Sequence, residues 1–135
     1  MNAVDTNILL YVHDPRDPDK QARAATLVRS LTDGVLLWQV ACEYLAASRK
    51  LEPFGYNRAQ AGEDIRDLRR TWTTILPGWD LLQRAEDLLA RFNLSFWDSL
   101  IVAACHEGNL TKLYSEDFGP YPRIDALEIV NPFIG

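Results

Sequence analysis

The sequence predicts an α/β fold in which a mainly parallel central sheet is flanked by helices. Short apolar runs alternate along the chain with longer segments of helical periodicity, and no internal repeat or linker interrupts the alternation. The 135 residues, 47% hydrophobic and 24% charged, suit a compact domain with one core. We therefore interpret residues 1–135 as a single domain.

Five short apolar runs are predicted to form the strands, because such runs are typical of buried parallel strands. In chain order they are Asn2–Val4, Val35–Trp38, Thr73–Leu76, Leu113–Ser115 and Leu127–Val130. The run Thr73–Leu76, which the turn Pro77-Gly78 follows, is the weakest of them.

Six segments between these runs have helical periodicity. In chain order they are Ile8–Val12, Asp19–Leu31, Gln39–Leu51, Arg58–Trp72, Asp80–Phe92 and Ser95–Glu107. The third is expected to stop before Pro53, because proline disfavours helix at the residue before it. The last is apolar on nearly all sides, which predicts a buried helix. Loops are expected at Asp14–Pro18 and Pro53–Asn57.

The charge balance argues against a broad nucleic-acid-binding surface. The net charge is −5, with 19 acidic against 14 basic residues, which is the wrong sign for such a surface. If four carboxylates form a metal site, 15 acids remain against 14 bases.

The longest apolar runs, such as Leu100–Cys105, are too short to span a bilayer, so we expect a cytoplasmic protein. Cys42 and Cys105, far apart in apolar contexts, are expected to be buried free thiols.

Four acids occupy positions from which they can converge. Asp5 and Asp117 each follow directly on a predicted strand, and functional crevices of parallel sheets lie at the carboxyl ends of the strands. Glu43 lies about 60° from the apolar stripe of its helix. Asp98 lies in the first turn of the apolar helix, where its neighbours are expected to leave it little solvent.

Clustered carboxylates favour a divalent cation. Mg²⁺ is usually held by one or two carboxylates together with waters and substrate phosphate. Carboxylates packed together raise one another's pKa unless a cation neutralises them. A bound Mg²⁺ polarises a phosphoryl oxygen and lowers the pKa of a water, which suits an acidic cluster to a polyanionic substrate.

Each acid also has a purely structural interpretation. Ser95 and Asp98 match a capping box, and Asp5 can cap the turn that follows it. A lone Glu43 is more often solvated or ion-paired, and Asp117 lies in a segment that reads as a loop. The tryptophans are more often core or interface residues than base-stacking platforms. The residues alone therefore leave structural and metal-binding roles open.

The motifs around these acids resemble those of PIN domains. The opening Val4–Tyr11, the segment Gln39–Leu45, the run Phe96–Ala104 and the segment Leu113–Gly119 match the acidic motifs of the family in order. Ile129–Phe133 resembles a common ending of the family. The resemblance covers essentially the whole chain and implies a toxin of the VapC type.

This resemblance implies a three-layer PIN-like fold and a Mg²⁺-dependent endoribonuclease, with Mn²⁺ as an alternative ion. The resemblance implies that the residues which bind the metal and carry out catalysis are Asp5, Glu43, Asp98 and Asp117. Asp5 and Asp98 are expected to be closest to the metal, with Thr6 and Ser115 orienting ligands or water. The implied reaction is in-line attack of metal-activated water on an RNA phosphodiester.

The resemblance also implies partners. Toxins of this family usually form homodimers and are inhibited by a small cognate antitoxin, whose contacts are expected among the apolar and basic residues between Phe54 and Trp72. Glu116 competes with Asp117 for the fourth acidic position, because neighbouring strand residues face opposite ways.

Two other functions remain open at this stage. The chain could be a catalytically silent RNA- or protein-binding module of the same fold. It could also be an Asp-based phosphotransfer domain, although Asn7 stands where a phosphatase would have its second aspartate. A receiver domain would have a lysine after a late strand, where this chain has Ser115-Glu116-Asp117.

Overall fold

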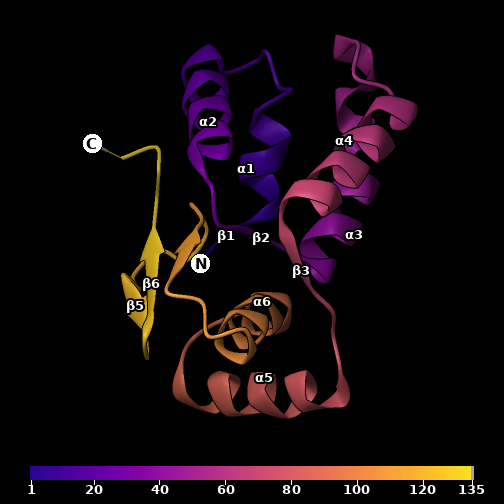
Figure 1. Cartoon of the computed structure of the whole chain (residues 1–135). Coiled ribbons are helices and arrows are strands. Elements are labelled where there is room, and N and C mark those ends of the chain that lie inside the picture. Colours follow the sequence, from indigo (N-terminus) through magenta and orange to yellow (C-terminus); the bar gives the residue numbers. More distant parts are fainter. Residues whose placement is uncertain (135) are drawn as a thin grey trace.

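The computed structural model describes residues 1–134, which form a six-stranded sheet with helices on both faces (Figure 1). The strand order is β3-β2-β1-β4-β6-β5, and every pair is parallel except β5 with β6. The strands are β1 (Asn2–Val4), β2 (Gly34–Leu37), β3 (Thr73–Ile75), β4 (Lys112–Tyr114), β5 (Arg123–Ile124) and β6 (Leu127–Val130). The predicted α/β class with a mainly parallel sheet is confirmed.

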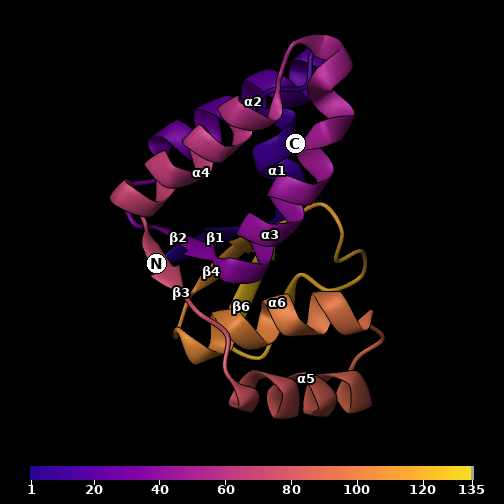
Figure 2. The same ribbon diagram turned by 90° about the vertical axis from the view of Figure 1, so that its right-hand side faces the viewer.

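The helices form two outer layers. They are α1 (Thr6–Tyr11), α2 (Pro18–Ser30), α3 (Trp38–Ala47), α4 (Arg58–Thr71), α5 (Trp79–Arg91) and α6 (Phe96–Glu107), with a 3₁₀ segment, η1 (Ser48–Phe54), after α3. Figures 1 and 2 show α1 to α4 on one side of the sheet and α5 with α6 on the other. The three-layer arrangement expected from the PIN resemblance is therefore confirmed.

The central strands are apolar because both of their faces are covered. Val35, Leu36 and Leu37 of β2 are each no more than 1% exposed, so every position of this strand has to be apolar. At the start of β2, a Cβ on Gly34 would lie 2.3 Å from the side chain of Trp72. Gly34 is therefore required for Trp72 to pack against the strand.

Several element boundaries differ from the prediction. The α-helix α3 ends at Ala47, but the chain stays helical past Pro53, because the 3₁₀ segment η1 follows directly and contains this proline. This segment occupies part of the expected Pro53–Asn57 loop. The two-residue strand β5 was not predicted, since it is too short to give a periodic pattern.

The predicted burial of α6 is confirmed for the middle part of the helix but not for its first turn. Burial begins at Ser99, and in the first turn Phe96 is 40% and Trp97 61% exposed.

Both cysteines are free thiols, as predicted, but only Cys105 is buried and Cys42 is exposed. Among residues 1–134, no single helix is long and apolar enough to cross a bilayer. The helices α5 and α6 reach that length and hydropathy only when counted together, and they meet at an angle of 117°.

Candidate active site

Asp5 stands at the carboxyl end of β1, in the middle of the sheet, and caps helix α1. Its carboxylate accepts two hydrogen bonds: Oδ1 from the backbone N–H of Thr6 at 2.8 Å, and Oδ2 from the hydroxyl of Ser115 at 2.8 Å. The side chain is almost fully buried, with 5% exposed. The capping role considered from the sequence is therefore real, and it orients the carboxylate rather than excluding another role.

Burial raises the pKa of Asp5 to about 6, against the lowering effect of its bonds from Ser115 and Thr6. The negative charges of Asp117 and Asp98 raise it further. A carboxylate kept in this environment at neutral pH is destabilised by its surroundings, and a nearby cation would relieve that cost.

Glu43 is tied to the same region from helix α3. Its Oε1 accepts a hydrogen bond of 2.7 Å from the hydroxyl of Thr6, and its Oε2 accepts one of 3.4 Å from the side-chain amide of Gln39. Gln39 also donates to the carbonyl oxygen of Trp97, 3.1 Å away, so it joins α3 to the first turn of α6. Glu43 is thus not a freely solvated surface residue.

Asp98 approaches from the first turn of α6. Its backbone N–H donates to the hydroxyl oxygen of Ser95 over 3.1 Å, which is the helix-capping contact that the sequence suggested. Partial burial raises the pKa of Asp98, and the charge of Glu43 raises it further. The expectation that the neighbouring residues leave Asp98 little solvent holds only in part, because Asp98 is half-buried and Trp97 beside it is largely exposed.

Asp117 follows β4 and faces the same cavity. Its Oδ2 accepts a hydrogen bond of 3.3 Å from the side-chain amide of Asn7, and its backbone N–H donates to Ser115 Oγ over 3.1 Å. Burial raises the pKa of Asp117, with further contributions from Glu116 and Asp98. Glu116 itself points elsewhere, toward Lys20 and Tyr11.

The four predicted acids line one cavity of about 230 Å³, although they come from four separate parts of the chain. Its lining residues are Asp5, Thr6, Asn7, Glu43, Ala47, Asp98, Ile101 and Asp117. Ser115 reaches the site through its bond to Asp5. Sequence reasoning missed Asn7 as a member of the site. Its place on the first turn of α1, two residues after Asp5, could have identified it.

The donor set of this cavity fits a hard divalent cation. All four acids offer carboxylate oxygens, the ligand type that Mg²⁺ and Mn²⁺ prefer. In the part of the chain that the structure describes, no group of three or more His, Cys, Asp or Glu side chains is arranged to hold an ion directly. Mg²⁺ usually takes one or two carboxylates and completes its shell with water, so the spread of the acids is compatible with a hydrated ion.

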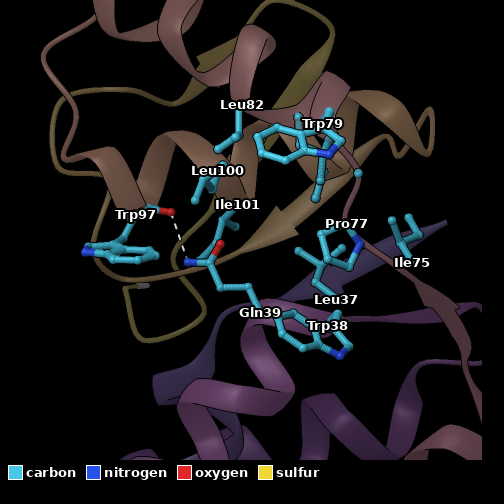
Figure 3. Close-up of a pocket in the computed structure, with 13 residues that line it drawn as sticks. Leu37, Trp38, Gln39, Ile75, Pro77, Trp79, Leu82, Trp97, Leu100 and Ile101 are labelled. Atoms are coloured by element: carbon cyan, nitrogen blue, oxygen red, sulfur yellow. Dashed lines mark hydrogen bonds between the residues drawn. The ribbon is translucent and has the colours of Figure 1, made fainter.

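A second, apolar groove of about 490 Å³ adjoins the acidic cavity (Figure 3). Ile101 lines both, and Gln39 and Trp97, joined by their hydrogen bond, line the apolar groove. Trp38, Trp79 and Trp97 line the groove and are 50%, 85% and 61% exposed. Of the four tryptophans, only Trp72 belongs to the core.

Comparison with known proteins places the chain in a family. The PIN domain model matches residues 3–127. No curated protein matches the chain.

Solved structures share its fold at low sequence identity. A toxin–antitoxin complex from Klebsiella pneumoniae is 20% identical, with a TM-score of 0.69 and 98% of both chains covered. VapC20 of Mycobacterium tuberculosis, described as a sarcin-ricin loop cleaving toxin, is 18% identical, with a TM-score of 0.70; 93% of this chain and 98% of that chain are covered.

VapBC2 of Rickettsia felis, bound to a DNA fragment from its promoter, is 15% identical, with a TM-score of 0.66; 96% of this chain and 97% of that chain are covered. Since the family model spans nearly the whole chain and the fold is the one expected for it, the chain belongs to the PIN domain family.

Proposed function

We propose that this PIN domain is a Mg²⁺-dependent endoribonuclease of the VapC type, the toxin of a toxin–antitoxin pair. The observation that carries the proposal is the meeting of Asp5, Glu43, Asp98 and Asp117 in one cavity at the carboxyl ends of the strands. These acids are far apart in sequence, and gathering them in one place costs free energy that a bound cation would offset.

A divalent ion, when bound, would acidify a water molecule and neutralise charge on the phosphodiester. We assign the positions closest to the ion to Asp5 and Asp98, with Glu43 and Asp117 acting directly or through water. Ser115 holds one oxygen of Asp5, and Thr6 holds one oxygen of Glu43, so that these carboxylates keep a fixed orientation. The fixed carboxylates would accept the proton that the attacking water releases.

The partners that we propose are an RNA substrate and a small cognate antitoxin, in the cytoplasm. The structural neighbours support the proposal of an antitoxin partner. The structure from Klebsiella pneumoniae is a toxin–antitoxin complex, and the one from Rickettsia felis is VapBC2. VapC20 is a toxin that cleaves the sarcin-ricin loop, and this activity of a structural neighbour supports RNA as the class of substrate that we propose here.

We further propose that the apolar groove is covered by a second copy of this chain. With about 200 Å² per tryptophan side chain, the exposed fractions of Trp38, Trp79 and Trp97 leave about 400 Å² of apolar surface in water. That is about half of the area that each partner buries in a standard interface. Exposed apolar patches of this size mark association surfaces, and a homodimer would remove this one from water.

The test of the nuclease is incubation with structured RNA, with and without Mg²⁺ and with a chelator. We expect cleavage that needs Mg²⁺ and that is lost in Asp98→Asn. Cleavage that persists in this variant, or that ignores the chelator, would contradict the proposal. Tight Mn²⁺ binding without turnover on any RNA would favour a silent binding module, and labelling of Asp5 by a small phosphodonor would favour phosphotransfer.

A further inference from the structure

Glu116 immediately precedes Asp117, yet its side chain lies on the opposite side of the chain, away from the acidic cavity. Its Oε1 accepts a hydrogen bond of 2.6 Å from the hydroxyl of Tyr11, and its Oε2 lies 2.8 Å from Nζ of Lys20. Tyr11 is the last residue of α1, and Lys20 lies in the first turn of α2. Glu116 thus connects the segment after β4 to two helices of the outer layer.

This contact is sheltered from solvent on several sides. The side chains of Lys20 and Glu116 are 30% and 17% exposed. The Lys20 ammonium lies 4.8 Å from the ring centre of Tyr11 and 5.1 Å from that of Phe133, and the two rings meet edge to face. A pair held in this way is more strongly localised than a surface ion pair, which is usually worth little.

The side chains of the four residues after β4 reach different surroundings, and Glu116 and Asp117 are directed to different sides of the chain. Ser115 reaches Asp5, Glu116 reaches α1 and α2, Asp117 lines the cavity, and Phe118 is buried in the core. Glu116 lies at a bend just after β4 and shares a peptide unit with Asp117, so holding its side chain against α1 and α2 restricts the backbone that places Asp117 on the cavity side.

Lys20 also prevents Glu116 from acting as a further free acid beside the site. The charge of Glu116 raises the pKa of Asp117, and the charge of Lys20 lowers it. Without Lys20, the Glu116 carboxylate would keep the hydrogen bond from Tyr11 but would lose its cation, and it would compete with Asp117 for any cation bound in the cavity.

We propose that Glu116 is a positioning residue, clamped by Lys20 and Tyr11, that holds Asp117 on the cavity side and thereby sets the affinity of the site for divalent cations. This inference rests on the proposed metal-dependent function and deepens it. It assigns to α2 a part in shaping the site, although no residue of α2 lines the cavity.

The first measurement of its test does not need a metal. In Glu116→Ala, hydrogen exchange of the Asp117 backbone amide, which donates to Ser115, should become about tenfold faster or more. The amides of β1 and β4 should keep their wild-type rates. General destabilisation would instead accelerate exchange throughout the sheet.

The second measurement is Mn²⁺ binding by titration calorimetry. Glu116→Ala and Lys20→Met should weaken binding about tenfold or more, as loss of a group that orients a metal ligand typically does. Lys20→Glu and Glu116→Lys should each weaken it, and the double variant should recover most of the affinity by restoring the ion pair with reversed polarity. The matched control is Arg84→Met, which breaks the 2.8 Å ion pair with Glu107 between α5 and α6 and should leave Mn²⁺ affinity unchanged.

The outcomes separate the two proposals. Wild-type exchange at Asp117 in Glu116→Ala, or a double variant no better than the single ones, would overturn the clamp. Faster exchange confined to Asp117 in Glu116→Ala, together with a wild-type protein that binds no Mn²⁺, would leave the clamp standing and overturn the metal-dependent function.

Discussion

The hydroxyl of Ser115 donates a 2.8 Å hydrogen bond to the buried carboxylate of Asp5 across 110 positions of sequence. The same oxygen accepts the backbone N–H of Asp117 at 3.1 Å. Because β1 and β4 are adjacent parallel strands, the residues that follow them meet at one edge of the sheet. One hydroxyl therefore links two of the four acids.

Replacement of Ser115 by alanine should loosen this link. The variant leaves Asp5 Oδ2 buried without its donor, so the free energy of unfolding should fall by about 1 to 3 kcal/mol. Metal affinity should fall about tenfold or more, because Asp5 loses its fixed orientation. Urea unfolding and Mn²⁺ titration measure the two effects. The control is Ser30→Ala, since the Ser30 hydroxyl donates to a helix carbonyl at the surface; equal effects in both variants would contradict the prediction.

The stability of the protein in the presence of a chelator should decrease between about pH 4 and pH 6. The folded state holds the Asp5 proton more tightly than the unfolded chain, with a pKa of about 6 against 3.8. The stabilisation from protonated Asp5 is therefore present at low pH and is lost as pH rises through 6, a loss of about 3 kcal/mol. Urea unfolding across this range measures it. Asp5→Asn should remove the larger part of the decline, and an unchanged pH profile in that variant would refute the assignment.

Divalent ions should stabilise the folded protein at neutral pH. At a concentration one hundred times the Kd, binding to the folded state alone adds about 2.7 kcal/mol to the free energy of unfolding. Thermal unfolding with increasing Mn²⁺ measures the effect, which should disappear in Asp98→Asn. Asp87→Asn makes the same chemical change on the exposed face of α5, 67% exposed, and should retain the full shift. A shift that survives in Asp98→Asn would place the ion elsewhere.

The apolar groove should govern self-association. Trp79, 85% exposed, is expected to be buried by the second copy, and Trp79→Ala should weaken the dimer by about 2 kcal/mol. Sedimentation over a range of concentrations measures this loss. Phe54→Ala removes another exposed aromatic side chain outside the groove and should leave the dimer intact. A wild-type protein that stays monomeric at high concentration would exclude this use of the groove.

The sequence was sufficient for the fold class because burial leaves a local pattern. Strands covered on both faces, such as β2, are continuously apolar, and amphipathic helices such as α5 show their period directly. Features without a pattern were missed or misjudged. The strand β5 has two residues, η1 continues past a proline, and the exposure of Trp97 depends on how far α5 and the sheet cover α6.

The places of Asp5 and Asp117 directly after predicted strands also allowed a prediction that they lie close together, since strand ends meet at one edge of a parallel sheet. The sequence could not decide between Glu116 and Asp117, because adjacent residues offer the same chemistry on opposite sides of the chain. That choice depends on Lys20 and Tyr11, which are distant in sequence and adjacent only after folding.

The sequence by itself therefore determined the alternation of strands and helices and the candidate acids, up to the choice between Glu116 and Asp117, because periodicity and position are local properties of the chain. Only the tertiary structure decided which oxygens are held by Thr6, Asn7 and Ser115, which acid turns away, and where apolar surface stays in water. The physical reason is that hydrogen bonds and burial join residues whose separation in sequence carries no information about their distance in space.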